Sequence, residues 1–571
     1  MFRRYYGVTK KFFGMGVVSK RLFSIMIIFN VLREALELVF PFIAAEIINL
    51  VSIGNFTGAT SLATLFLVYG ILFTFVCHLA SNSYTKFSID LREKLRNKYV
   101  EKVSKYDEAY TDEIPHAFIT SSAFGDIAST AIFGEYIILA SINLLSIVAA
   151  CVILMFVDLP VGLAAVVLVT IATISLGRNL KRRDFFSSSR STTQDSIANV
   201  MGQIIEGNKE IQAFNIQDKI RDHAARFHRQ WDYETRSMAF YSANSFALTP
   251  TILHIGRIAI YVALTILVIS QGFPVATLVL IVGYYANIID GFQEFAVDHV
   301  PDLSTNSVAV DRVHRVLNYR SKHMHKFGDY DRDSIDGKVE FRNVSFSYDQ
   351  KRRILKNIDF IIPPHSLVAI VGRSGSGKTS IFRLLARLFK PSSGKILLDD
   401  VDINEYTSEV YVSNVASVSQ SPFVFNMSIR ENLSLVNPNH EEQVAACKKA
   451  GVHDFIINLR NGYDTQLNGD SKVIPESKKQ LIAIARALLS KAEVILLDEV
   501  TAATDMNTSE KIIKIMQELK EDHTVIIATH DPGIMRKADR IIIIDDGEVV
   551  GQGTHKTLLS RNKYYRRIQN R

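Results

Sequence analysis

Long runs of apolar residues alternate with charged segments along the first half of the chain. Six of these runs have about the 20 residues that a helix needs to cross a bilayer. They lie near residues 22–50, 60–82, 134–157, 159–178, 244–270 and 274–297. The pattern predicts six transmembrane helices, all before residue 300.

The polar connections between these runs are of two kinds. The connections "VSIGNFTGAT", "VDLPVG" and "SQGFP" contain no Lys or Arg, whereas "MFRRYYGVTKKFFGMGVVSKR", "LREKLRNKYVEKVSK" and "RNLKRRDFF" are rich in them. Because positive residues stay on the cytoplasmic side, we expect both termini in the cytoplasm and short exterior loops. The charged leader is amphipathic, so we expect an elbow helix along the inner membrane surface.

Two of the cytoplasmic gaps are long, roughly residues 86–133 and 179–243. Both carry many charges and few helix breakers. The membrane helices should therefore continue well into the cytosol before they turn back.

The pattern changes after the polar stretch "RSKHMHKFGDYDRDSIDGK". Short β-rich runs such as "VEFRNVSF", "VILLDE" and "TVIIATH" alternate with helical stretches, which predicts an α/β domain with a largely parallel sheet. We therefore expect a transmembrane domain over residues 1–320, a linker over 321–337 and an α/β domain over 338–571.

The composition agrees with a membrane protein. Of the 571 residues, 48% are hydrophobic, and the formal net charge is +7. The positive charge is concentrated beside the apolar runs, so it indicates contact with inner-leaflet lipid rather than with nucleic acid.

A glycine-rich segment, "GRSGSGKTS", lies between the strand-like "VAIV" and the helical "IFRLLARLF". It fits the pattern G-x-x-x-x-G-K-[ST], and this strand-then-helix context makes the match specific. Glycines let backbone N–H groups surround phosphate oxygens, Lys378 supplies a cation to the terminal phosphates, and Thr379 offers a hydroxyl to Mg²⁺. The residues expected to bind the nucleotide are Gly372, Ser374, Gly375, Gly377, Lys378, Thr379 and Ser380.

The run "VILLDEV" has the pattern of a buried strand that ends in two carboxylates, Asp498 and Glu499. By itself, such a pair would be a solvated turn. Together with the upstream phosphate loop, it predicts that Asp498 holds Mg²⁺ and that Glu499 polarises the attacking water as a general base.

Over essentially its whole length, the chain resembles an ATP-binding cassette half-transporter of the exporter type. The resemblance implies a six-helix α-helical transmembrane domain fused to an α/β P-loop nucleotide-binding domain, with ATP and Mg²⁺ as cofactors and hydrolysis coupled to export. It also implies that Tyr348 in "VSFSYD" stacks on adenine, that Gln420 in "VSQSPF" contacts Mg²⁺ and water, and that His530 in "IIATHD" contacts the γ-phosphate.

Two cytoplasmic segments resemble the coupling helices of that family, roughly residues 104–118 and 211–219. The second, "IQAFNIQDK", matches better, because the first lacks the usual Phe-Asp and Gly spacing.

The chain departs from the family at its signature, Leu-Ser-Gly-Gly-Gln. Counting back from the helical "QLIAIARALL" places Ile474, Pro475, Glu476, Ser477 and Lys478 on those five positions. In a cassette dimer the signature closes over the ATP held by the other subunit. Pro475 removes a hydroxyl and an N–H group, and Glu476 brings a carboxylate toward a triphosphate, which Lys478 would partly offset.

We therefore expect a heterodimer in which the partner half-transporter supplies an intact signature. The "AATD" segment, residues 502–505, departs from the usual Ser-Ala-Leu-Asp and also favours asymmetry. The alternatives are a slow homodimer with two impaired sites, a regulatory ATP-gated membrane protein, and an importer of the siderophore type with the exporter architecture. The short exterior loops and half-size architecture favour a bacterial inner membrane.

Charged residues inside two of the apolar runs are candidates for substrate contact. Arg33 and Glu37 are four residues apart, close enough to pair, and Asp290 and Glu294 have the same spacing in the last run. One hypothesis is an acidic cavity wall for a cationic or amphipathic substrate, because membrane-embedded charges usually face a bundle interior. The other is charge pairing near the cytoplasmic helix ends.

Overall fold

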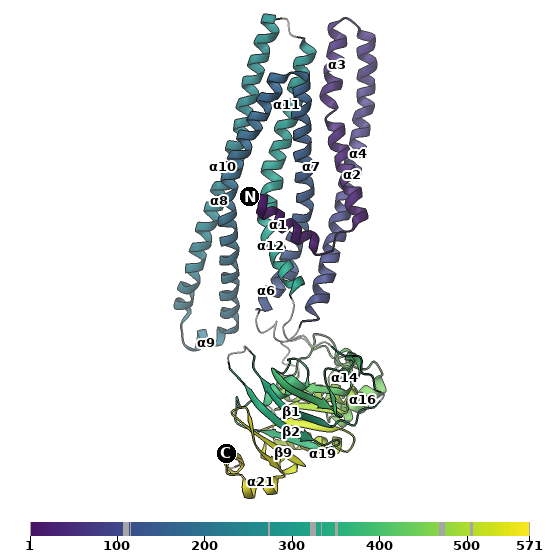
Figure 1. The fold of residues 1–571 in the computed structure, drawn as a ribbon, viewed down its shortest axis with the longest axis vertical. Helices are drawn as coiled ribbons and strands as arrows, with labels where there is room; N and C mark the ends of the chain where they lie inside the picture. Colours follow the sequence, from purple (N-terminus) through teal and green to yellow (C-terminus); the bar gives the residue numbers. More distant parts are fainter. Residues whose placement is uncertain are drawn as a thin grey trace. The chain divides into compact units, whose positions relative to one another are not determined.

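The computed structural model describes residues 2–106, 114, 116–271, 274–319, 327–332, 334–348, 352–467, 474–502 and 506–569. These residues divide into two compact units, a helical one up to Tyr319 and a mixed α/β one after it. In Figure 1 the helical unit is coloured purple to teal and the mixed unit green to yellow.

Long helices joined by short turns make up the first unit. They are α1 (Phe2–Gly14), α2 (Lys20–Glu37), α3 (Phe40–Ser52), α4 (Phe56–Val103), α6 (His116–Ser121), α7 (Ile127–Val157), α8 (Leu159–Glu206), α9 (Asn208–Ala213), α10 (Gln217–Gln271), α11 (Val275–Gln293) and α12 (Val300–Asn318), with π turns η1 (Ser122–Asp126) and η2 (Glu294–His299).

Six segments of the described chain are long and apolar enough to cross a membrane. They are Lys20–Ser52, Phe56–Val103, Phe118–Val157, Leu159–Glu206, Gln217–Ile266 and Val275–Asn318. Each overlaps one of the predicted apolar runs, so the predicted six-helix fold class is confirmed.

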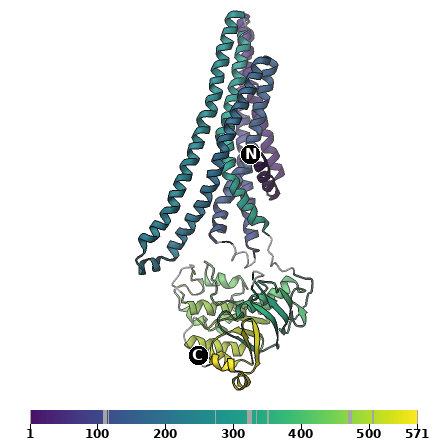
Figure 2. The same cartoon turned by 60° about the vertical axis from the view of Figure 1, so that its left-hand side comes forward.

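The helices extend well past the thickness of a bilayer. The helices α4 and α8 have 48 residues each, or about 72 Å at the rise of an α-helix, against roughly 30 Å of hydrocarbon. Figure 2 shows α8 and α10 side by side, with α9 closing the hairpin between them. Of the long gaps predicted to be helical, residues 107–113 and 115 lie outside the described residues.

Tight turns with side-chain caps separate consecutive long helices. Only Asp158 lies between α7 and α8, and its carboxylate accepts a hydrogen bond of 3.0 Å from the N–H of Val161. Pro160 occupies the first turn of α8, where its missing N–H costs nothing. Asn55 caps α4 in the same way through the N–H of Gly58. These caps explain why the predicted exterior loops are so short.

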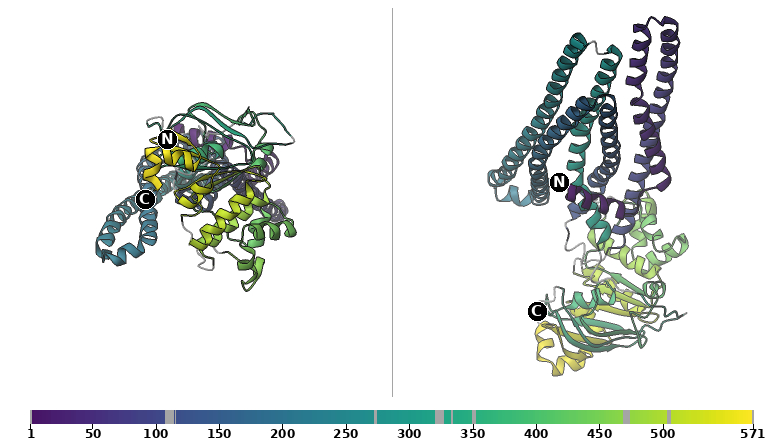
Figure 3. Two further views of the ribbon diagram at one scale, coloured as in Figure 1. Left: turned by 90° about the horizontal axis from the view of Figure 1, so that it is seen from below. Right: turned by 45° about the horizontal axis from the view of Figure 1, so that its top comes forward.

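The leader forms α1, which crosses the longer helices rather than running parallel to them (Figure 3). Val8, Phe12 and Met15 are buried in the core of the helical unit. A Cβ on Gly134 of α7 would lie only 2.2 Å from the Phe12 ring, so this glycine gives α1 room to approach. The amphipathic leader is thus held by packing on the bundle.

The α/β unit contains two sheets. Its strands are β1 (Val339–Phe346), β2 (Leu355–Ile362), β3 (Leu367–Val371), β4 (Ser393–Leu398), β5 (Val401–Asp402), β6 (Val415–Val418), β7 (Val494–Asp498), β8 (Thr524–Ala528), β9 (Arg540–Asp545) and β10 (Glu548–Gly553). Its helices are α13 (Lys378–Leu385), α14 (Ser408–Asn414), α15 (Ile429–Ser434), α16 (His440–Lys449), α17 (His453–Ile457), α18 (Glu476–Leu489), α19 (Met506–Leu519), α20 (Pro532–Lys537), α21 (His555–Arg561) and α22 (Lys563–Gln569), with a 3₁₀ turn η3 (Gly462–Asp464).

The larger sheet has the order β10-β9-β3-β8-β7-β6 and is parallel except for β10; the smaller, antiparallel one has the order β2-β1-β4-β5. The strand β3 is buried on both faces. Leu367, Ala369 and Val371 belong to one apolar cluster, and the alternating Val368 and Ile370 belong to the other. Because a central parallel strand is covered on both sides, it is apolar throughout. The predicted α/β domain with a largely parallel sheet is confirmed.

Candidate nucleotide-binding site

The glycine-rich loop turns between β3 and α13, at the carboxyl end of the parallel strands. A Cβ on Gly372 would lie 2.2 Å from the carbonyl oxygen of Ile544, and Gly377 has φ +109°. The buried hydroxyl of Ser376 has no hydrogen-bond partner. The loop therefore combines a glycine-dependent backbone with an unused polar group, as a phosphate cradle requires.

Lys378, the first residue of α13, is only 4% exposed. Its Nζ donates to the carbonyl oxygens of Gly372 and Arg373 at 3.0 and 3.2 Å, and lies 3.6 Å from Oε1 of Glu499. Burial lowers the pKa of Lys378 below its ordinary value, while Glu499 opposes this shift. The loop thus directs a largely desolvated cation at the space that a terminal phosphate would fill.

Asp498 is the last residue of β7 and is 8% exposed. Its Oδ1 is buried without a hydrogen-bond partner. Burial raises the pKa of this carboxyl above its ordinary value, and a hydrogen bond from Thr379 acts in the opposite direction. An orphaned carboxylate oxygen beside a hydroxyl fits a Mg²⁺ ion whose other ligands are phosphate oxygens and water.

Glu499 follows directly and adopts φ +48°, which is uncommon for a residue with a Cβ. Its N–H donates to the carbonyl oxygen of Ala528 at 3.0 Å, which ties this conformation to β8. Strained backbone of this kind persists where the surrounding structure holds it, often at functional sites.

Gln420 and His530 reach the same carboxylate from two other segments. The Nε2 of Gln420 donates to Oε2 of Glu499 at 3.3 Å, and Nε2 of His530 lies 3.3 Å from Oε1. The same His530 nitrogen is 3.0 Å from Nζ of Lys378. Burial lowers the pKa of His530, and Lys378 lowers it further, so the neutral ring can accept a hydrogen bond from Lys378.

A cavity of about 230 Å³ opens beside these groups. Its lining residues are Glu499, Thr501, Ala502, Thr529, His530 and Asp531. Glu499 and His530, which are far apart in the sequence, therefore line one open space, and Lys378 and Gln420 contact Glu499 from two other segments.

Tyr348 lies against α13. Its hydroxyl is 3.0 Å from that of Ser380, and its ring packs edge-on against Phe346 and Phe389. Arg383 also donates to the Tyr348 hydroxyl, at 3.2 Å. These contacts place the ring next to the phosphate-loop helix. Ser374 and Gly375, in contrast, are exposed at the tip of the loop.

Two polar residues of α18 hold the segment that carries Gln420, and the sequence pattern did not single them out. Gln480 donates to the carbonyl oxygen of Ser419 at 3.3 Å, and Arg486 donates to that of Phe423 at 2.6 Å. Gln480 is only 4% exposed. Gln480 could have been found from the sequence, because a glutamine on the buried face of an amphipathic helix needs a hydrogen-bond partner.

The five residues at the signature positions lie at the start of α18. Pro475 is the N-cap and forms no side-chain capping bond, so the helix begins at Glu476. Ile474 is buried, whereas Pro475 and Glu476 are exposed and Ser477 is half-buried. The helix N-terminus thus presents a proline ring and a carboxylate to solvent in the single chain.

In the single chain, a lysine other than Lys478 forms the ion pair with Glu476. Lys479 pairs with Glu476 at 3.2 Å, one helical turn along, whereas Nζ of Lys478 lies over the ring of Phe455 at 5.5 Å. In the single chain the ring of Phe455 attracts the ammonium group of Lys478, and the expectation that Lys478 offsets the carboxylate beside a partner's nucleotide stays a prediction.

The charged candidates of the membrane-crossing helices lie at the end of α2 and around the junction of α11 and η2. The four-residue spacing of Arg33 and Glu37 along the helix favoured an ion pair between them. Instead, Nη2 of Arg33 bonds to the carboxylate of Glu34. That prediction is wrong because the guanidinium of Arg33 bonds to the carboxylate of its immediate neighbour, although Glu37 lies one turn along the same helix. Asp290 lies in α11, and Glu294 begins η2.

The second expected coupling segment, residues 211–219, contains the end of α9, a turn and the start of α10. Most of the first, residues 107–113 and 115 of 104–118, lies outside the described residues, as do residues 503–505 of the "AATD" segment.

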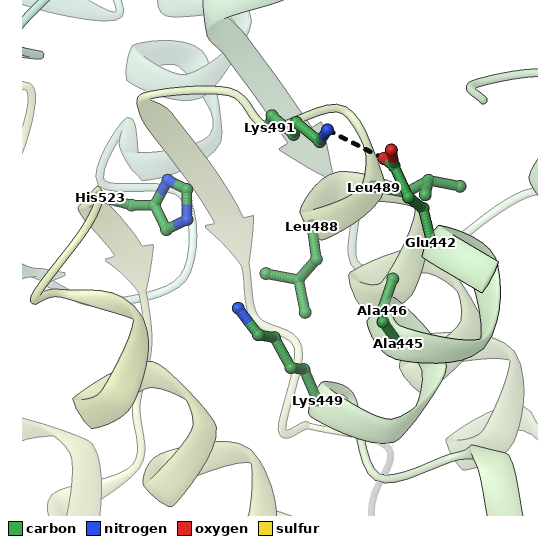
Figure 4. A pocket seen from close by; sticks show the side chains of 8 residues that line it. All are labelled: Glu442, Ala445, Ala446, Lys449, Leu488, Leu489, Lys491 and His523. Carbon is green, nitrogen blue, oxygen red and sulfur yellow. Dashed lines mark ion pairs between the residues drawn. The ribbon is translucent and has the colours of Figure 1, made fainter. Parts of the chain in front are cut away.

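A second pocket of about 260 Å³ lies at the amino ends of β7 and β8, away from the nucleotide loops (Figure 4). It is lined by Glu442, Ala445, Ala446, Lys449, Leu488, Leu489, Lys491 and His523. Lys491 pairs with Glu442 at 2.9 Å. Lys449 ends α16 and Lys491 follows α18, where cations offset the negative ends of helix dipoles. These lysines thus have a structural explanation separate from the nucleotide site.

Two protein-family models match the chain. The model described as the ABC transporter transmembrane region matches residues 23–290, and the ABC transporter model matches residues 355–502. The second match contains the glycine-rich loop, Gln420, Asp498 and Glu499.

Individual relatives match over most of their length. An ATP-dependent lipid A-core flippase of Haemophilus influenzae (strain ATCC 51907) is 30% identical over 458 residues, which are 79% of this chain and 75% of that protein. YgaD of Bacillus subtilis, a candidate multidrug export ATP-binding/permease protein, is 25% identical over 98% of this chain and 99% of that protein. The solved structure of a bacterial Atm1-family ABC exporter with ATP bound has the same fold, with a TM-score of 0.82, 23% identity, and coverage of 96% of this chain and 98% of that one.

Proposed function

The chain belongs to the ABC transporter family, and on that premise we propose that it is one half of an ATP-driven exporter whose two ATP sites differ. With its ATP-binding and transmembrane regions, it is a multi-pass membrane ATPase whose activity is coupled to transport. What is proposed concerns the roles of individual residues, the partner and the direction of transport.

One observation carries the proposal. Lys378, Gln420 and His530 lie within 3.6 Å of Glu499, so this chain has a complete set of groups for hydrolysis. The start of α18 instead presents Pro475 and Glu476 where the family has Ser and Gly. The chain thus keeps its own site and lacks what it would contribute to its partner's site.

At its own site, each side chain has one task. Glu499 accepts the proton of the attacking water as a general base, and Gln420 orients that carboxylate through Oε2. Lys378 and His530 bind the terminal phosphate, for which the neutral ring offers an uncharged donor. Tyr348 stacks on adenine beside α13.

Mg²⁺ would be held by Thr379, Asp498 and Gln420. The fit rests on the buried, unpaired Oδ1 of Asp498 and its neighbouring hydroxyl. When bound, the ion supplies positive charge that stabilises the phosphates during transfer. The described residues contain no group of three or more His, Cys, Asp or Glu side chains placed to hold a metal, so the nucleotide would complete the coordination.

The partner's site would be weak for an electrostatic reason. A carboxylate about 4 Å from a phosphate repels it by roughly 1 kcal/mol in water and about 4 kcal/mol at an effective dielectric constant of 20. Pro475 also removes an N–H from the helix N-terminus that would face the anion. Lys479 reduces this repulsion by pairing with Glu476. We therefore propose binding without efficient turnover at that site, and a heterodimer rather than a homodimer.

Export across a bacterial inner membrane, with both termini in the cytoplasm, is the proposed direction and location. The names of two relatives describe multidrug export and a lipid A-core flippase, and both relatives are bacterial. The distribution of Lys and Arg in the connections supports the orientation.

The test is to purify the chain alone and together with a co-expressed half-transporter that has an intact signature. We expect substantial ATPase activity only from the pair, and its loss on Glu499→Gln in this chain. Purification of a homodimer with substrate-stimulated ATPase that depends on Glu499 would overturn the heterodimer.

A further inference from the structure

The first membrane-crossing segment is broken inside the span. The helix α2 ends at Glu37 and α3 begins at Phe40, with Pro41 in its first turn. The last turn of α2 contains no basic residue, and Glu34 and Glu37 lie in its last turn. Carboxylates at a helix C-terminus add to the negative end of the helix dipole, so this charge arrangement is the opposite of the favourable one.

A second pair of carboxylates lies at the same depth on another helix. Glu37 is fifteen residues before the end of its span at Ser52, and Asp290 is fifteen residues after the start of its span at Val275. At 1.5 Å per residue, both are about 22 Å from those ends, and Glu294 is about 28 Å away. Counted from the turns that join the spans, all three are therefore no deeper than the roughly 30 Å that the hydrocarbon of a bilayer occupies.

Specific contacts bring these two regions together. The hydroxyl of Tyr284 on α11 donates to the carbonyl oxygen of Leu38, at the break, at 2.9 Å. Pro41 packs so closely on α11 that a Cβ on Gly283 would lie 2.6 Å from it. Glu37 interacts electrostatically with both Asp290 and Glu294 across this contact.

The cluster has more negative than positive charge. The four carboxylates are those of Glu34, Glu37, Asp290 and Glu294. Two guanidinium groups lie in this region: Arg33, which already bonds to Glu34, and Arg257, which lies near Tyr261 together with Asp290. Uncompensated charge inside a membrane is costly and usually belongs to a functional site. A positively charged ligand would supply what the protein lacks.

Buried polar side chains beside the cluster independently point to a ligand. Asn143 of α7 is 3% exposed, lies against Gly291 next to Asp290, and its Nδ2 has no hydrogen-bond partner. His299 is 4% exposed, and its Nδ1 also lacks a partner, while its Nε2 faces Glu294 at 3.6 Å. His299 ends the π turn η2, and π turns within long helices are frequent at functional sites.

The surroundings favour an organic cation over a metal ion. Within the described part of the chain, no three His, Cys, Asp or Glu side chains are placed to hold a metal. Aromatic rings lie close by: the ring of Tyr136 is 5.4 Å from that of His299, and Phe295 packs against the same apolar cluster as Tyr136. Aromatic faces and dispersed carboxylates suit a large cation with a delocalised or shielded charge.

We propose that the acidic membrane site, formed by Glu34, Glu37, Asp290, Glu294, Asn143 and His299, binds a lipophilic organic cation as the transported substrate. This inference rests on the proposed function, because it assigns the substrate class of that transporter. The break in the helix places the carboxylates of Glu34 and Glu37 inside the span, and discontinuous membrane helices form substrate sites in other transporters.

The test measures binding of tetraphenylphosphonium and of tetraphenylborate, ions of the same shape and opposite charge, to the full-length protein in lipid nanodiscs. We expect saturable binding of the phosphonium and none of the borate. The variants Glu37→Gln and Glu294→Gln should each weaken phosphonium binding about tenfold or more. Glu46→Gln is the matched control, since Glu46 is an exposed carboxylate of α3 in the same span.

Thermal unfolding and ATP binding of each variant establish that it is folded. Equal binding of the two ions, no phosphonium binding, or wild-type affinity in both carboxylate variants would overturn the site. The proposed function fails separately, if the wild-type protein and its partner hydrolyse no ATP, because ion binding is measured without turnover.

Discussion

Buried charges of the nucleotide site are held in place by partners that a ligand would replace. In this structure Lys378 bonds to two loop carbonyl groups and to His530, and Asp498 has one oxygen without any partner. Such groups cost stability until an anion or a cation arrives. Single substitutions of these residues should therefore change protein stability, ATP binding and ATP hydrolysis to different extents.

Asp498→Asn should raise the melting temperature of the nucleotide-free protein. Burial raises the folded-state pKa of Asp498 above its unfolded value, so its ionisation destabilises the folded protein as pH rises above that unfolded value. At neutral pH the amide avoids this cost. Thermal unfolding without nucleotide checks it, and the same variant should lose the extra stabilisation by Mg²⁺ and ATP. An unchanged or lower melting temperature would contradict the account.

Glu499→Gln and Lys378→Ala should have different effects. The first removes the general base but keeps the shape of the site, so ATP binding should persist while hydrolysis falls by about 10²–10⁴-fold. The second removes the buried cation, so ATP binding itself should be lost. Equilibrium binding of a labelled ATP analogue, beside steady-state hydrolysis, distinguishes them. Equal loss of binding in both variants would refute the roles assigned here.

Two elements shape the nucleotide site and the signature: the loop between β3 and α13, and the helix α18. The loop between β3 and α13 is closed by contacts with β9, since Gly372 lies against Ile544, and α18 holds the segment of Gln420 through Gln480. The N-terminus of α18 has no side-chain cap and begins with a carboxylate paired to Lys479. This helix therefore supports the segment of Gln420 in its own chain, and we propose that its N-terminus is a poor surface for a second nucleotide.

Pro475→Ser should stabilise α18. A serine at the N-cap can accept a hydrogen bond from the first turn, worth about 1 kcal/mol, whereas proline caps nothing in this structure. Chemical denaturation of the purified protein measures the change, with Ser477→Ala as a control at a position that is not the cap.

In the pair with its partner, the double change Pro475→Ser and Glu476→Gly should tighten ATP binding at the partner's site. No gain in either measurement would argue against a defective signature.

As a whole molecule, the chain combines a helical unit with a single α/β unit. The two family models match both parts, and we propose that its own hydrolytic groups are complete while its signature is degenerate. A transporter assembled from two halves would then have unequal sites. The consequence is an asymmetry that experiments on the assembled pair can measure.

In the assembled pair, Glu499→Gln in this chain should abolish most ATP turnover. The glutamine substitution at the corresponding position of the partner should change turnover by less than about twofold, because that site faces Pro475 and Glu476. Steady-state ATPase assays of the two variants in lipid, at matched protein concentration, provide the comparison. Equal losses from both substitutions would show that the two sites work alike.

Gln420 and His530 were expected from the resemblance to a known family. The sequence by itself determined the six membrane-crossing helices, the parallel α/β sheet, and the glycine-rich loop with Lys378. These follow from local signals: hydropathy summed over about 20 residues, alternation along short strands, and glycine spacing in one loop. Each of these signals depends on residues close together in the chain, so each can be recognised in the sequence without a structure.

Only the tertiary structure decided the pairings between distant segments. It joined Arg33 to Glu34 rather than Glu37, Lys479 rather than Lys478 to Glu476, and Tyr284 to the helix break at Leu38. Periodicity places side chains on a face, but a partner depends on rotamers, helix ends and what packs opposite. The acidic membrane site exists because two helices distant in sequence bring their carboxylates to one depth, which no local pattern encodes.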